Sequence, residues 1–405
     1  MRQLLIIGNG FDIQSELPSR FIDFYKDRVQ NQFELAFEVD TYDLNRDSLE
    51  KLQLSIPTVF ISNEHQVSSF EATPIKWSEK CKKITFWDLV MMFSFEKENN
   101  INWCNIEEHI NLLTSKLLKK DENEESVLTV ESLLKVNETR GNSDIHGNVK
   151  RVLELVIDQT HDENLIFISV INKLREDKYT NSNIDEFLLE ELYLYEESFK
   201  NYIQNEADKH STVYGANKSE LLDKISIEAP EYTYLLNFNY TFNKFPISEK
   251  VRPGYLTSTN IHGSIGDEVI FGIDHSSVLA ESRVYPFTKT FRKLIKTSSP
   301  NPEKSVLKKD IKYIIFYGHS LGSADYSYFQ SIFDYLDIYE NQIILTFYFS
   351  NYLGSQEGAL ELKREQSTAV QKMLHIYGES MDNKVKGKNL IHKLLIEERL
   401  SISEI

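Results

Sequence analysis

Two side chains with the chemistry to act on a ribose follow strand-like segments in the second half of the chain. Asn239 comes directly after the apolar and aromatic run at residues 232–238, and its amide can both donate to and accept from ribose hydroxyls. His262 precedes Gly263, and an imidazole with an ordinary pKa of about 6.5 can take a proton from a hydroxyl or a water near neutral pH. We therefore expect Asn239 and His262 to be catalytic. Each also has a purely structural interpretation, as a strand terminator and as a packed histidine.

A first glycine turn follows the apolar run at residues 4–7 and precedes an amphipathic segment. Glycines at such a position let the backbone approach a pyrophosphate, whose charge is favoured by free N–H groups and a helix N-terminus. The third glycine of the dinucleotide fingerprint is missing, so a tight turn without a ligand fits this motif about equally well. The residues that we expect to bind a cofactor here are Gly8, Asn9, Gly10, Phe11 and Asp12.

A second glycine turn follows the apolar run at residues 311–317. It reads Gly318-His319-Ser320-Leu321, and Asp325 follows it. Backbone N–H and hydroxyl groups of such a turn can bind the ribose or phosphate of a dinucleotide, so we expect Gly318, His319, Ser320 and Asp325 to bind the cofactor as well.

The second turn also satisfies the Gly-x-Ser-x-Gly pattern of a nucleophile elbow. A serine hydrolase built on Ser320, with His375 or His392 as its base, is therefore an alternative. Another alternative joins His262 to Asp274 and His275 in a metal site, as in a metal-dependent nuclease. Because no other ligand cluster has recognisable spacing, we expect no metal.

Strand-like and helix-like segments alternate around these motifs. Apolar runs predict strands at residues 4–7, 232–238, 269–271, 311–317 and 343–349, and the helix-like segment 326–336 between the last two indicates a parallel crossover. Helical patterns fill 103–118, 127–136, 148–159, 164–175 and 184–205. We predict an α/β fold, a Rossmann-like parallel sheet with a large helical insertion. The predicted division is 1–85 and 226–352 for the α/β domain, 86–225 for the insertion and 353–405 for a C-terminal helical segment.

Composition narrows the classes of partner. The 405 residues include 45 basic and 62 acidic ones, and the formal charge of −17 disfavours nucleic acid or an anionic membrane as the primary partner. No window approaches the roughly 18 consecutive apolar residues of a membrane span. The two cysteines, Cys81 and Cys104, are too few for a disulfide framework. We expect a cytoplasmic protein.

In their order, the motifs resemble the NAD-binding pattern of sirtuins. That family begins with Gly-Ala-Gly-x-Ser, and Asp12 takes the place of its serine. The resemblance implies that Asn239 contacts the nicotinamide ribose, that His262 is the base and that NAD is the ligand. Sirtuins carry an aspartate two residues after the asparagine, where this chain has Thr241, and their acetyl-lysine groove and four-cysteine zinc module have no counterpart here. Protein deacylation is therefore not implied.

Five short segments occur in an order that is typical of one family. They are residues 5–12 with Pro18 and Phe21, the helix start Trp103-Cys104-Asn105-Ile106-Glu107, and residues 238–241, 261–263 and 318–321 with Asp325. These segments resemble AbiH, the bacterial phage abortive-infection proteins, and the resemblance implies an antiphage effector. Sirtuin-like domains in other bacterial defence proteins suggest that it binds NAD and hydrolyses it as a glycohydrolase. We expect a phage or host trigger protein as a partner, and control either through homo-oligomer assembly or through the charged C-terminal helices. A non-catalytic nucleotide-sensing or protein-binding defence module is the alternative.

Overall fold

The computed structural model describes residues 1–36, 47–48, 83–93, 106–118, 183–245, 249–251, 256–275, 278–297, 303, 305–322 and 325–405. The chain divides into two compact units. The sheet unit comprises Met1–Arg20, Lys200–Ile270 and Lys293–Ile405, and the helical unit comprises Phe21–Phe199 and Phe271–Arg292. Both cysteines, residues 103–105 and the predicted helices at 127–136, 148–159 and 164–175 lie outside the described residues.

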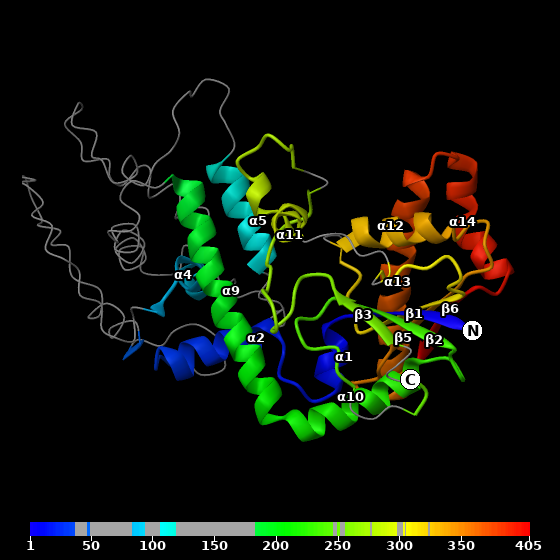
Figure 1. Cartoon of the computed structure of the whole chain (residues 1–405), viewed down its shortest axis with the longest axis horizontal. Helices are drawn as coiled ribbons and strands as arrows, with labels where there is room; N and C mark the ends of the chain where they lie inside the picture. Colours follow the sequence, from blue (N-terminus) through cyan, green and yellow to red (C-terminus); the bar gives the residue numbers. More distant parts are fainter. Residues whose placement is uncertain are drawn as a thin grey trace, which may run out of the picture. The chain divides into compact units, whose positions relative to one another are not determined.

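The sheet unit is built on six parallel strands (Figure 1). Their order is β3-β2-β1-β4-β5-β6, which is the strand order of the doubly wound dinucleotide-binding fold. The predicted α/β fold with a Rossmann-like parallel sheet and a helical insertion is thus confirmed. The strands are β1 (Arg2–Ile7), β2 (Tyr232–Asn237), β3 (Leu256–Asn260), β4 (Tyr313–Tyr317), β5 (Ile344–Phe349) and β6 (Leu400–Glu404).

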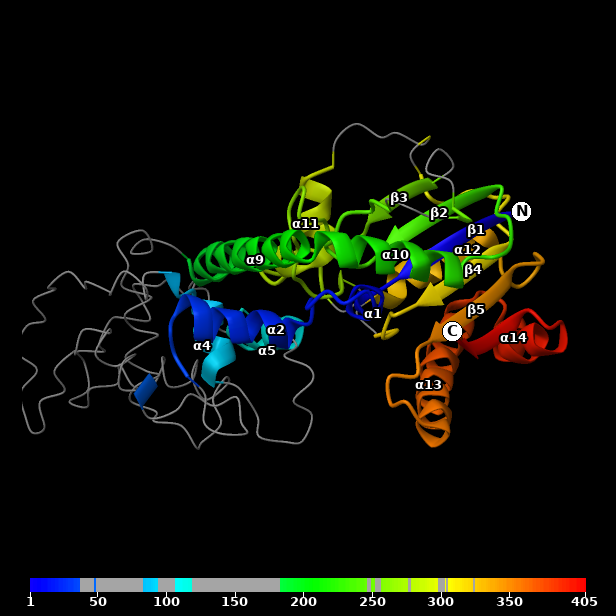
Figure 2. The same cartoon turned by 90° about the horizontal axis from the view of Figure 1, so that it is seen from below.

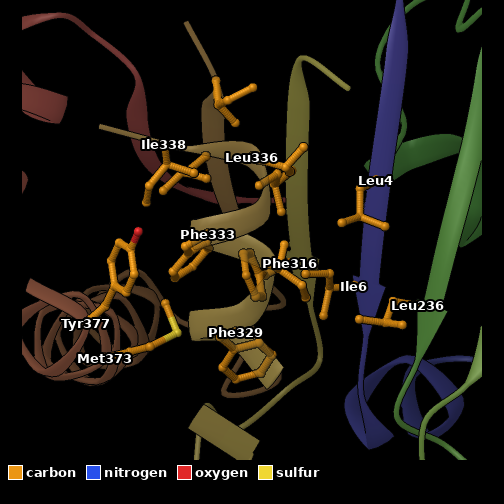
Figure 3. Packing of buried hydrophobic residues seen from close by; sticks show 14 of the residues in the cluster. Leu4, Ile6, Leu236, Phe316, Phe329, Phe333, Leu336, Ile338, Met373 and Tyr377 are labelled. Carbon is orange, nitrogen blue, oxygen red and sulfur yellow. The ribbon is translucent and has the colours of Figure 1, made fainter. Parts of the chain in front are cut away.

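The central strands are apolar on both faces because helices cover both sides of the sheet. On one face, Leu4, Ile6 and Phe316 belong to a core whose other side chains come from α12 (Tyr326–Leu336) and, beyond it, from α13 (Gln356–Ser380), as Figure 3 shows. On the other face, the alternate side chains of β1 pack with those of α10 (Ser211–Ile225). Because successive side chains of a strand point to opposite faces of the sheet, each strand contributes to two separate hydrophobic cores.

Two further helices complete the sheet unit. The short α1 (Asn9–Gln14) follows β1 directly, and α14 (Lys384–Ile396) packs on α13, which also contacts β5 and β6 (Figure 2). Gly378 of α13 and Gly387 of α14 face each other so closely that a Cβ on Gly387 would lie 1.9 Å from the carbonyl oxygen of Gly378. A side chain at either position would clash with the other helix, so the close packing of α13 and α14 requires glycine at both positions.

The helical unit contains α2 (Phe21–Lys26), the π-helix η1 (Asp27–Gln32), α4 (Phe86–Phe93), α5 (Ile106–Leu117), α9 (Ile184–Lys209) up to Phe199, the 3₁₀ helix η6 (Tyr285–Phe287) and the start of α11 (Lys289–Ile295). Buried ion pairs join Arg28 to Asp88 and Arg292 to Glu196. Among the helices of the described residues, none has both the length and the apolar character that crossing a bilayer requires.

Three details of the predicted sheet are wrong. Residues 269–271 form no strand and contribute only one antiparallel bridge, between Val269 and Gly263. The strand beside β2 is β3, whose sequence Leu-Thr-Ser-Thr-Asn is half-buried and polar, and the edge strand β6 was not predicted either. Edge strands bury less apolar surface, so hydrophobicity signals them weakly.

Candidate functional site

Four strands of the sheet unit end at the same level, which we term the carboxyl edge. Ile7 pairs with both Asn237 and Tyr317, and Asn237 pairs with Asn260. The residues after β1, β2, β3 and β4 therefore emerge side by side. In open parallel sheets ligands bind at this edge, where the strand order reverses, and here it reverses between β1 and β4.

The two glycine turns pack directly against each other at this reversal. The Gly10 N–H donates to the Gly318 carbonyl at 2.8 Å, and the Gly8 N–H donates to the Tyr317 carbonyl at 3.0 Å. A Cβ on Gly8 would lie 2.6 Å from the Cα of His319, and one on Gly10 would lie 2.7 Å from the Cα of Gly318. The glycines therefore let the backbones of the two turns approach each other, and not only a pyrophosphate as the sequence suggested.

The first turn has little hydrogen-bonding capacity left for a ligand. Besides those of Gly8 and Gly10, the N–H of Phe11 is used, donating to the Gly8 carbonyl at 2.9 Å. The Phe11 side chain is buried in the core, whereas Asn9 is exposed and exchanges hydrogen bonds with Ser19. A pyrophosphate contact at this turn stays a prediction, and of these side chains Asn9 is the one that faces solvent.

Asp12 lies in a buried network behind the first turn. Its carboxylate accepts hydrogen bonds from the Tyr214 hydroxyl at 2.7 Å and the Thr241 hydroxyl at 3.0 Å, and it is 1% exposed. Lys218 lies 3.5 Å from the Tyr214 oxygen and donates to the Phe242 carbonyl. Burial raises the pKa of Asp12, while Lys218 and the two hydroxyls lower it. These contacts account for the Asp12 side chain, and its predicted part in cofactor binding stays a prediction.

Burial lowers the pKa of Lys218 to about 8, against the upward pull of the Asp12 charge. Between about pH 8 and its ordinary value of 10.5, the unfolded chain holds a proton that the folded chain has released, so rising pH stabilises the fold. We expect the free energy of unfolding of the native chain, minus that of Lys218→Met, to increase across this window by about 1–3 kcal/mol. Urea unfolding at several pH values measures it. The exposed Lys363→Met is the control, and a difference that stays flat would contradict the prediction.

Asn239 ties the end of β2 to the first turn. Its side-chain amide donates to the Gly8 carbonyl at 3.0 Å, its N–H donates to the Asn237 side chain at 2.8 Å, and its carbonyl accepts from Asn260 at 2.7 Å. Asn239 is 4% exposed. Asn237 has a structural role, because its side chain also donates to Asn243. Asn239 is therefore fixed at the carboxyl edge by three neighbours.

His262 follows β3 and lies against a carboxylate from another segment. Its Nε2 is 3.0 Å from an Asp325 carboxylate oxygen, and the Nε2 of His319 is 3.4 Å from the other oxygen. The side chains of His262, His319 and Asp325 are 5%, 6% and 15% exposed. We call these three residues the His–Asp–His cluster. It unites His262, predicted to be catalytic, with two residues predicted to bind the cofactor.

Aromatic rings surround the two imidazoles. The Phe238 ring meets that of His262 at a centroid distance of 5.5 Å and that of His319 at 4.6 Å, both edge to face, and the Tyr328 ring lies 5.8 Å from His262. Lys293 donates to the carbonyl of Ile261 at 2.7 Å. These contacts hold the imidazoles in one orientation and exclude water from part of the cluster, which strengthens the interaction with the carboxylate.

The geometry does not support Ser320 as the nucleophile of an elbow. Positive φ angles occur at Gly318 (67°) and Leu321 (54°) but not at Ser320, whereas an elbow places the serine itself on a strained turn. His375 and His392 are exposed on α13 and α14, and His375 pairs with Glu379. In the described part of the chain, Ser320 makes no hydrogen bond to a histidine. The second turn presents Ser320 to solvent.

The alternative metal site gains no support either. His275 is 3.0 Å from the Thr290 hydroxyl and 3.8 Å from Asp274, and these residues belong to the helical unit, not to the unit of His262. Over the described ranges, no three His, Cys, Asp or Glu side chains are grouped in a way that could hold a metal ion.

Several residues of the carboxyl edge were not identified from the sequence. Lys218 and Tyr214 lie on a helix where they look like ordinary surface positions, and Asn260 ends a strand too polar to be recognised. Asn260 donates to the carbonyls of both Asn239 and Thr241. The sequence pattern that could have identified Asn260 is the asparagine that ends each of two successive strands, Asn237 in β2 and Asn260 in β3.

Comparison with known proteins gives a match at the family level. A family model described as "Bacteriophage abortive infection AbiH" matches residues 4–349, which includes both glycine turns, Asn239 and the His–Asp–His cluster. No significant match was found among curated proteins or among solved structures.

Proposed function

Since this chain belongs to the AbiH family and so has a role in phage abortive infection, we propose that it binds NAD and hydrolyses the bond between nicotinamide and ribose. Loss of NAD would then stop the metabolism of an infected cell. The site that would act is the carboxyl edge, with Asn239 and His262 as the catalytic residues.

One observation carries this proposal: Asn239 is bonded to the turn after β1 and His262 to Asp325 after β4, and β1 and β4 are the two strands between which the strand order reverses. The side chain of Asn239 is anchored to the turn after β1, and Asp325 brings His262 next to the turn after β4. A nucleotide lying across this edge would meet both side chains. The buried positions of Asn239 and His262 favour fixed orientations, which orientation-dependent catalysis needs.

In the proposed reaction the bond between the ribose C1′ and the nicotinamide nitrogen breaks, and nicotinamide leaves as a neutral molecule. The ribose takes on oxocarbenium character, and a water molecule adds to C1′. With the Nε2 of His262 donating to Asp325, the basic nitrogen of the neutral ring is Nδ1. Nδ1 is buried, so the bound ligand and its water must open this side of the ring before Nδ1 takes the proton of that water. The products are nicotinamide, ADP-ribose and a proton that His262 passes to solvent.

The anionic part of NAD has fewer candidate partners than the sequence indicated. The N–H groups of Gly8, Gly10 and Phe11 are already used within the protein. We therefore assign ligand contacts at the two turns to the exposed side chains, Asn9 and Ser320. Both are uncharged hydrogen-bonding groups and can bind ribose or phosphate oxygens.

The direct test incubates the purified chain with NAD, with and without phage lysate, and follows nicotinamide release. Release of nicotinamide in either condition supports the proposal. Binding of NAD or ADP-ribose in both conditions without release would instead favour the nucleotide-sensing module.

Asn239→Ala should lower kcat/KM for NAD by about 10²-fold, because a poorly oriented ribose reacts slowly. It also removes the hydrogen bond to the Gly8 carbonyl, at a cost of about 1 kcal/mol in stability. Asn383→Ala is the matched control: it removes the cap of α14, also at about 1 kcal/mol, far from the carboxyl edge along the chain. Equal turnover in the two variants would remove Asn239 from the mechanism.

A further inference from the structure

We infer that Asp325 and His319 are positioning residues, which fix the tautomer of His262 and stabilise its protonated form, instead of contacting the ligand. This inference rests on the proposed function, because it specifies how that site holds its base. The observation behind it is the carboxylate shared between two imidazole rings.

Asp325 occupies the position that precedes α12, where an aspartate ordinarily accepts a hydrogen bond from a backbone N–H of the first helical turn. Its side chain makes no such capping bond. One carboxylate oxygen instead lies 3.0 Å from His262 and the other 3.4 Å from His319. Near a helix N-terminus the negative charge of Asp325 is favoured, so an ionised carboxylate faces the imidazoles.

The protonation of His319 follows from its second nitrogen. Its Nδ1 accepts a hydrogen bond from the Leu321 N–H at 2.9 Å, so this nitrogen carries no proton and the ring is neutral. The proton of His319 is then on Nε2, directed at Asp325. Leu321 is held at φ 54° in this arrangement, a left-handed conformation that leucine rarely adopts. The turn thus keeps His319 neutral, with its Nε2–H beside Asp325 at an N–O distance of 3.4 Å.

This arrangement defines what each partner does for His262. An ionised Asp325 requires a proton on the Nε2 of His262, which leaves Nδ1 as the basic nitrogen. When Nδ1 takes a proton, Asp325 stabilises the resulting imidazolium. The Nε2–H of His319 lies near the other oxygen of the same carboxylate, at an N–O distance of 3.4 Å, and this partial positive charge moderates the pull of Asp325 on His262. The other ionisable groups at this strand end are Tyr328, whose ring contacts His262, and Lys293, which donates to the Ile261 carbonyl.

Nitrogen NMR of histidine-labelled protein tests the inference without requiring turnover. His262→Gln and His319→Gln assign the signals. We expect protons on the Nε2 of both rings in the native chain, and a shift of the His262 proton to Nδ1 in Asp325→Asn, because the new amide can donate to Nε2. An unchanged His262 tautomer in Asp325→Asn would overturn the inference. A proton on the Nδ1 of His319 in the native chain would overturn the role inferred for His319.

Turnover and NAD binding separate this inference from the proposed function. Asp325→Asn should lower kcat by about 10²- to 10⁴-fold with the Kd for NAD within about threefold. His319→Gln should lower kcat by about tenfold. It should also move the acidic limb of the kcat/KM profile to higher pH, because Asp325 then holds the protonated form of His262 more strongly; a merely structural role of His319 would not produce this shift. Weakened NAD binding with normal turnover of bound NAD would make Asp325 a ligand contact. If the native chain shows the tautomers but never cleaves NAD, only the proposed function fails.

Discussion

His262→Ala should cleave NAD about 10²- to 10⁴-fold more slowly than the native chain, because it removes the proton acceptor of the proposed reaction. The loss should appear in kcat, and the Kd for NAD should change little, since the imidazole is assigned to the water and not to the ligand's recognition. Nicotinamide release measures the first quantity and calorimetric titration the second.

A folding control is needed because His262 is 5% exposed and lies between Phe238 and Tyr328. His262→Gln keeps a polar side chain of similar length and should be equally inactive while staying closer to native stability. His375→Ala makes the same change at a histidine that is 66% exposed, and it should leave both turnover and unfolding unaltered. Turnover by a folded His262→Gln at the native rate would exclude His262 as the base.

The sequence predicted the centre of the fold better than its edges. The strands β1, β2 and β4 are buried on both faces, whereas β5 is buried on one face and half-buried on the other. Each of the four appears in the sequence as a nearly continuous apolar run. β3 and β6 pair along one side only, and strand order there depends on contacts distant in the sequence. Apolar periodicity contains no record of such pairing, so β3 was missed and residues 269–271 were preferred in its place.

The motifs of the site were found, but not how their side chains are used. The sequence places Asp325 after a glycine turn, and nothing in that position indicates that it meets His262 from another strand end. Likewise, Thr241 appeared as a departure from the sirtuin pattern. In the structure its hydroxyl donates to Asp12, which takes the place of the sirtuin serine.

Gly318→Ala should destabilise the chain by about 2–5 kcal/mol, the sum of an unfavourable backbone angle and an overfilled contact. Gly318 has φ 67°, and a Cβ there would lie 2.4 Å from the Phe11 nitrogen and 2.7 Å from the carbonyl carbon of Gly10. These neighbours are backbone atoms, which cannot rotate away as a side chain can. The turn must move, and His319 moves with it, so turnover should fall as well.

Gly354→Ala separates the two causes. Gly354 also has φ 67°, but a Cβ there would meet nothing within 4 Å. It should therefore show only the backbone term, about 1–2 kcal/mol, and leave turnover unchanged. The difference between the two urea-unfolding free energies measures the close packing of the glycine turns. Equal losses would mean that the turns separate readily, and the N–H groups of Gly8 and Gly10 would then become available to a pyrophosphate after all.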